Sequence, residues 1–182
     1  MNLYEHFREK IRMWFLAKTL KKVPRKKKIA GYQQYTNFGI LYDASTEENY
    51  KRIILLVKDL QHDQKKVKTL GFVNQKKMPE YSFPKLTFEF CNKKAFALNY
   101  QPRAQGVKDF LSQKYDVIID LSNTEFFHLK YIAALSDAPL KVGRFHNKYV
   151  ELFDFMLELK EDAPIDEVIN QTMYYLKMIN NA

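Results

Sequence analysis

Acidic and hydroxyl side chains follow two short apolar runs of this sequence, in a pattern that could support acid–base chemistry. The run FGILY ends just before Asp43, and the run VIIDL contains Asp120 near its end. If the two runs are neighbouring parallel strands, their carboxyl ends meet at one crevice, where doubly wound sheets bind ligands. Two carboxylates there, with a histidine nearby, could transfer protons or hold a metal weakly. The candidate crevice residues are Asp43, Ser45, Asp120, Ser122, Asn123 and His128.

The same residue types occur at strand and helix ends for purely structural reasons. Ser45 and Asn123 can each cap a helix, because their side-chain oxygens accept hydrogen bonds from free backbone N–H groups. Asp43 and Asp120 can satisfy the N–H groups of tight turns in a similar way. Capping and turn formation explain these residues without a ligand. The sequence therefore favours a structural role for these residues. The alternative is a shared small-molecule site that binds a nucleotide or nucleotide sugar.

Other signals of enzyme chemistry are weak. The four histidines, His6, His62, His128 and His146, lack metal-site spacing such as H-E-x-x-H. The single cysteine, Cys91, excludes an internal disulfide and a cysteine-based zinc site, and its place in a predicted strand indicates buried packing. No Walker loop, nucleophile elbow or dinucleotide fingerprint is found. The sequence therefore predicts neither a cofactor nor a metal, and gives an enzymatic function little support.

Positive charge is concentrated at the N-terminus. Of the net charge of +9, residues 1–36 carry +8, with ten lysines and arginines against two glutamates. Residues 37–182 carry 20 basic and 19 acidic residues and are nearly neutral. Such asymmetry indicates an anionic partner and says nothing about the fold.

Three interpretations of this basic segment are open. The first is RNA or ribonucleoprotein (ribosome) binding, in which lysines contact phosphates and Tyr32 and Tyr35 stack on unpaired bases. The second is binding to an anionic membrane surface, in which Trp14 and Phe15 would enter the interface. In the third, the aromatic face packs on the domain and the lysines only solubilise it. Our preferred function is RNA binding by Lys18, Lys21, Lys22, Arg25, Lys26, Lys27, Lys28, Tyr32 and Tyr35.

The basic segment is expected to be a helix followed by a linker. Over residues 3–22, Tyr4, Phe7, Ile11, Trp14 and Phe15 recur at spacings of three and four, which places them on one helical face. Pro24 ends the helix, and residues 25–28 form a cationic block expected to be mobile. The chain has no apolar run of 18 residues and no signal-peptide core, so we expect a cytoplasmic protein with two parts, residues 1–36 and residues 37–182.

Residues 37–182 alternate between predicted strands and helices. Residues 115–143 read as one strand–helix–strand unit, and a capping box at residues 45–48 begins a helix after the first strand. Residues 86–99 alternate in polarity and are expected to add an antiparallel hairpin. The pattern predicts an α/β fold: a mostly parallel, doubly wound (Rossmann-like) sheet with helices on both faces and an amphipathic N-terminal helix.

The segments YDVIIDLS and HLKYIAALSDAPLKVGRF, the later strand FDFMLEL and the amphipathic C-terminal helix resemble an uncharacterised protein family of Bacteroidota. This resemblance implies a fold and a lineage, with no established activity. The same region is similar to one half of heptosyltransferase-like glycosyltransferases, whose A-x-x-x-x-G segment corresponds to Ala138 through Gly143. A second nucleotide-sugar domain is missing from this sequence, so the similarity implies a shared fold only.

Overall fold

The computed structural model of the chain describes residues 3–122, 126–160 and 162–179. Its centre is a six-stranded sheet with the order β3-β2-β1-β4-β5-β6, in which all neighbouring strands are parallel. The strands are β1 (Asn37–Asp43), β2 (Lys66–Phe72), β3 (Phe88–Cys91), β4 (Val117–Asp120), β5 (Leu140–Arg144) and β6 (Phe155–Leu157). The α-helices are α1 (Leu3–Lys22), α2 (Glu47–His62), α3 (Gln105–Ser112), α4 (Phe127–Leu135) and α5 (Ile165–Met178). Short 3-10 helices are η1 (Tyr32–Gln34), η2 (Lys93–Ala95) and η3 (Asn147–Tyr149).

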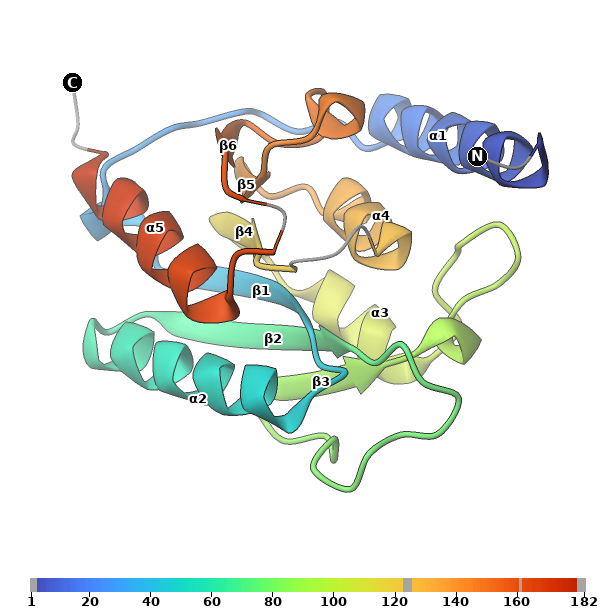
Figure 1. Cartoon of the computed structure of the whole chain (residues 1–182). Coiled ribbons are helices and arrows are strands. Elements are labelled where there is room, and N and C mark those ends of the chain that lie inside the picture. The colour runs from blue at the N-terminus through green and yellow to red at the C-terminus, as the bar shows by residue number, and fades with distance from the viewer. Residues whose placement is uncertain (1–2, 123–125, 161, 180–182) are drawn as a thin grey trace.

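Helices cover both faces of the sheet (Figure 1). On one face, α2 and α5 pack against strand residues such as Ile40 and Ile119. On the other, α3 and α4 pack against Leu41 and Ile118, and α1 lies over α4. Alternate residues of β1 and β4 point to opposite faces, and both faces are buried, which explains why these strands are apolar throughout. The doubly wound sheet with an added N-terminal helix, predicted from the sequence, is confirmed.

The expected antiparallel hairpin at residues 86–99 is wrong. Strand β3 pairs in parallel with β2, with Thr69 opposite Phe88. The segment after it forms η2, and its one antiparallel contact is an isolated bridge between Phe96 and Pro102. The reason is the long loop after β2, which carries the chain back to the amino edge of the sheet before β3 begins. A strand that re-enters from that edge must run parallel to its neighbour.

The capping residue of α2 is Thr46 rather than Ser45. The Thr46 side chain accepts a hydrogen bond from the backbone N–H of Asn49 at 3.2 Å. The Ser45 hydroxyl instead accepts from the backbone N–H of Asn74 at 3.0 Å, in the loop that follows β2. Ser45 therefore joins two neighbouring loops, a contact that local sequence spacing does not reveal.

Helix α1 is placed as predicted, but it buries a different face. Leu16 and Thr19 are its buried residues, and the Thr19 hydroxyl donates to the hydroxyl of Tyr131 on α4 at 3.0 Å. Tyr4, Phe7, Ile11 and Trp14 are exposed. The buried face is decided by α4, which contacts mainly the C-terminal half of α1, and not by the position of the largest apolar side chains. The aromatic face therefore does not pack on the domain, although Phe15 at its border is half-buried against Tyr100.

Gly143 on β5 allows the Phe153 ring to lie directly on the strand. A β-carbon at this position would lie 2.7–2.8 Å from three carbon atoms of the ring. We therefore expect Gly143→Ala to destabilise the protein by about 1–3 kcal/mol through overpacking, as measured by urea denaturation.

The matched control for this substitution is the same change in a Phe153→Leu background. Without the aromatic ring, the added methyl group no longer clashes with Phe153, so Gly143→Ala should lose little stability in this background. Equal losses in both backgrounds would show that Gly143 is required for another reason.

Candidate functional site

The carboxyl ends of β1 and β4 meet at one edge of the sheet, which was the condition for a shared crevice. The two strands are neighbours, and Leu41 lies opposite Asp120 in the register. The chain leaves β1 for α2 on one face and leaves β4 for α4 on the other, so this position is the switch point of the sheet. The condition for a shared crevice is therefore met, and the question is whether its side chains are available to a ligand.

Asp120 is buried and fully partnered. Its carboxylate accepts a hydrogen bond from the Lys130 ammonium group at 2.6 Å and from the Ser122 backbone N–H at 3.0 Å. The same ammonium group donates to the Ser122 hydroxyl at 3.0 Å. The exposed fractions of the Lys130 and Asp120 side chains are 5% and 0%. A carboxylate enclosed in this way cannot contact a bound substrate, so Asp120 and Ser122 hold α4 against β4.

The remaining predicted residues at this edge are also occupied by structural contacts. Asp43 accepts from the Ser45 backbone N–H at 2.9 Å, as expected for a turn. Asn123, the predicted cap of α4, lies outside the described residues. Within the ranges that the structure describes, no group of three or more histidine, cysteine, aspartate or glutamate side chains could hold a metal ion.

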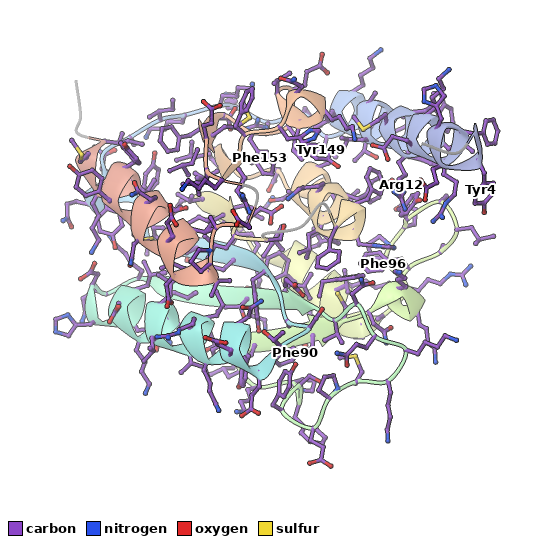
Figure 2. The ribbon with its side chains drawn as sticks, in the orientation of Figure 1. Tyr4, Arg12, Phe90, Phe96, Tyr149 and Phe153 are labelled. Atoms are coloured by element: carbon purple, nitrogen blue, oxygen red, sulfur yellow. The ribbon has the colours of Figure 1, made fainter. Side chains whose placement is uncertain are left out.

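His128 belongs to an aromatic cluster rather than to an acid–base pair. Its ring stacks on Phe72 with centroids 4.9 Å apart, and Phe96 and Tyr100 lie within 5.5 Å. Burial, together with the positive charges of Lys93 and Arg12, lowers the pKa of His128 to about 4. The imidazole is therefore neutral at neutral pH. Figure 2 labels Phe96, one member of this cluster, in the region between α4 and β3.

The sequence analysis missed Lys130, which neutralises the Asp120 carboxylate at the candidate crevice. Its position was a usable signal, because it is the one charged residue in the stretch FHLKYIAAL of α4. A lysine at a buried position of an apolar helix requires a buried acceptor. Asp120 is the acidic residue of the preceding strand and supplies that acceptor.

Arg25 anchors the segment after α1 to the sheet. The guanidinium group pairs with both oxygens of Asp154, at 2.5 and 2.9 Å, and donates to the carbonyl of Pro139 at 3.2 Å. The exposed fractions of the Arg25 and Asp154 side chains are only 8% and 6%. Residues 23–31, which we call the strap, also donate a backbone hydrogen bond from Lys28 to Pro139. The expectation that Arg25 is mobile and free to contact phosphate is therefore wrong, because it is held inside the protein.

Tyr32 and Tyr35 are also buried. The Tyr32 hydroxyl donates to Asp63 at 2.8 Å, and the Tyr35 hydroxyl accepts from the backbone N–H of Ala30 at 2.7 Å. The Lys65 ammonium group lies beneath them and donates to the carbonyls of both tyrosines. Neither ring has a free face, so neither can stack on a base.

Five of the predicted phosphate-binding lysines remain available. They are exposed, and none lies within ion-pair distance of a carboxylate in the described part of the chain. Lys27 is exposed too, but its ammonium group lies 3.1 Å from Asp154. We call the other five the cationic edge: Lys18, Lys21, Lys22, Lys26 and Lys28.

Lys141 on β5 is buried beside the anchor of the strap. Its backbone N–H donates to Asp154 at 3.0 Å, but its amine has no hydrogen-bond acceptor among the described residues. Burial lowers the pKa of Lys141 to about 7, and the charges of Arg25 and Lys27 act in the same direction against the opposing pull of Asp154 and Asp137. Burial by itself would raise the pKa of Asp154, but the hydrogen bonds from Arg25 and Lys141 hold it below its usual range.

Comparisons with known proteins identify a family and no function. A family model described as "Family of unknown function (DUF6913)" matches residues 8–179. No curated protein and no solved structure matches the chain. No helix in the described ranges combines the length and the apolar character that crossing a membrane requires.

Asp120→Asn should destabilise the protein rather than remove an activity. The change leaves the Lys130 charge buried without a carboxylate, which costs about 3–5 kcal/mol in comparable cases. Urea denaturation measures this loss, and the double variant Asp120→Asn/Lys130→Met should regain most of it because both charges are gone. An Asp120→Asn protein as stable as the wild type would contradict the structural role.

Lys141→Met should stabilise the protein, most strongly at low pH. The folded protein binds the Lys141 proton more weakly than the unfolded chain, so wild-type stability rises with pH between the folded pKa of about 7 and the ordinary value of 10.5. The stability gain of the variant should be roughly 3 kcal/mol larger at about pH 6 than at about pH 9. Urea denaturation at both pH values measures it, with the exposed Lys58→Met as control. A stability gain of Lys141→Met over the wild type that does not change with pH would show that the Lys141 amine keeps its ordinary pKa.

Proposed function

We propose that this chain, which belongs to the DUF6913 family of unknown function, binds phosphate-rich polyanions through its cationic edge. The observation that carries the proposal is the set of five exposed lysines without carboxylate partners on α1 and the strap. Some lysines elsewhere, such as Lys51, Lys114 and Lys177, are paired with acids. Exposed lysines elsewhere without an acidic partner in the described structure, such as Lys58, Lys94 and Lys108, lie on separate elements. Unpaired cations that follow one another along the chain can neutralise successive phosphates and release their counterions.

The anchor at Arg25 supports this function without contacting the partner. Because Arg25 and Asp154 fix the strap to β5 and β6, the lysines on either side of Arg25 are presented from a defined backbone. A fixed backbone loses less conformational freedom on binding than a mobile arm would. The charge of the segment is therefore divided between a buried anchor and an exposed binding surface.

RNA in a ribonucleoprotein is the first candidate partner on sequence grounds. Since Tyr32 and Tyr35 are buried, the contact would be made with phosphates and would depend weakly on base sequence. We place the protein in the cytoplasm, where such partners occur. The alternative is a nucleotide or nucleotide-sugar site, suggested by the similarity to heptosyltransferase-like enzymes. It has less support, because the Lys130 ammonium group already donates hydrogen bonds to Asp120 and Ser122. The Bacteroidota lineage implied by the resemblance stays an expectation.

Binding of a labelled single-stranded RNA should weaken steeply with salt. Replacing all five lysines of the cationic edge by glutamine should reduce the slope of log affinity against log salt by about 3.5, since each contact contributes about 0.7 for single strands. Fluorescence anisotropy at a series of salt concentrations measures this slope.

The matched control removes the same number of charges elsewhere. Lys58, Lys76, Lys77, Lys94 and Lys108 are all exposed and have no acidic partner in the described structure. Their replacement by glutamine should leave most of the slope intact. If the two variants behave alike, binding reflects net charge only and the cationic edge has no special role.

A further inference from the structure

The exposed face of α1 carries an apolar stripe that nothing in the described structure covers. Tyr4, Phe7, Ile11 and Trp14 are 65%, 62%, 37% and 57% exposed. Their spacing of three and four residues places them on one side of the helix, away from the buried Leu16 and Thr19. Single exposed apolar residues are ordinary, but four large ones in a row on one helix mark an interaction surface. We call these four residues the apolar stripe.

Cationic side chains flank the apolar stripe, and others follow it on the same face of α1. The Lys18 ammonium group lies 4.8 Å from the centroid of the Trp14 ring, and the Arg8 guanidinium group lies 5.5 Å from that of Tyr4. Lys18 and Lys22 follow Trp14 at intervals of four, so the same face of α1 is apolar in its first half and cationic in its second. A helix with large apolar side chains flanked by lysines and arginines is typical of segments that lie in a membrane interface.

Helix α1 and the strap, which carry the apolar stripe and the cationic edge, lie along one side of the molecule (Figure 1). In Figure 1, α1 and the strap both run along the outer side of the fold, beyond α4 and the sheet. Figure 2 shows Tyr4 at the free end of α1, pointing away from the body of the protein, whereas Arg12 points inward. Ile29 adds a further apolar side chain to the strap and is 61% exposed. A flat partner can therefore contact both surfaces at once.

We infer that the phosphate-rich partner of this edge is an anionic lipid bilayer, with the apolar stripe in the interface and the cationic edge on the headgroups. This inference rests on the proposed function and specifies its partner. Long lysine side chains can keep their ammonium groups at the headgroups while their stems lie along apolar surface. Each anionic headgroup near a lysine adds to the binding, and the buried apolar side chains make it more than electrostatic.

The stripe suits a bilayer better than RNA or a second copy of the chain. Base stacking gives no role to Ile11, which has no ring, and a cation already lies over one face of Tyr4 and of Trp14. A second copy would bring its own Arg8, Lys10 and Lys18 to the contact, where like charges repel. An anionic bilayer offers a charge opposite to the border of the stripe and an apolar layer beneath it.

Trp14 is the only tryptophan of the chain, so its fluorescence reports on the stripe directly. The full-length protein is titrated with vesicles of phosphatidylcholine, with and without phosphatidylserine. We expect a blue shift of the Trp14 emission and protection from acrylamide with the anionic vesicles only. The double variant Phe7→Ser/Ile11→Ser keeps the reporter and should lower the affinity by about tenfold or more for each side chain removed.

The matched control is Phe83→Ser/Leu86→Ser. These two side chains are 69% and 94% exposed, on the loop that precedes β3, so their loss removes apolar surface without touching α1. The control should bind vesicles as the wild type does. Replacing the five lysines of the cationic edge by glutamine should abolish the preference for phosphatidylserine. Analytical ultracentrifugation without vesicles establishes the oligomeric state.

The outcomes separate this inference from the proposed function. RNA binding without any vesicle binding would overturn the lipid partner and leave polyanion binding in place. Binding to neither would overturn both. Vesicle binding that survives Phe7→Ser/Ile11→Ser would show a purely electrostatic contact and would refute the role of the stripe. A blue shift of Trp14 caused by self-association without lipid would assign the stripe to a dimer.

Discussion

The ion pair between Arg25 and Asp154 is the interaction on which the functional surface depends. It joins the strap to β5 and β6, and thereby converts a cationic N-terminal segment into part of the folded protein. A bidentate arginine–carboxylate pair is rigid in geometry, and its burial makes the loss of either partner costly. With the strap fixed, α1 packs on α4 through residues such as Thr19 and Arg12 and leaves its opposite face to solvent.

Three buried lysines in the described structure show how differently the fold can accommodate a charge. Lys65 donates to three backbone carbonyls beneath the rings of Tyr32 and Tyr35. Lys130 pairs with Asp120 and lies 5.8 Å from the ring centroids of both Tyr149 and Phe153. Lys141 has no acceptor for its amine, and the cost of burial appears as a lowered pKa. The first two stabilise connections between elements, whereas the third opposes folding when it is protonated.

At the switch point of the sheet, the predicted side chains make structural contacts within the protein and are not available to a ligand. Doubly wound sheets commonly bind ligands there, and the adjacent strands β1 and β4 bring the expected acidic residues to that edge. Asp120 pairs with Lys130, Asp43 and Ser45 form turn and loop contacts, and His128 is enclosed by aromatic rings. The surface that combines consecutive unpaired cations with uncovered apolar side chains is instead the cationic edge, together with the apolar stripe on α1.

The sequence by itself determined the α/β class, the parallel central strands and the placement of most helices, because strands buried on both faces must be apolar and helices repeat their apolar residues every three or four positions. It also determined where the charge is concentrated. Tertiary structure decided that β3 runs parallel to β2, that Lys130 neutralises Asp120, and that α1 buries Leu16 while exposing Trp14. Each of these outcomes depends on contacts between residues far apart in the chain, and local spacing contains no information about which distant surface a helix or a charge will meet.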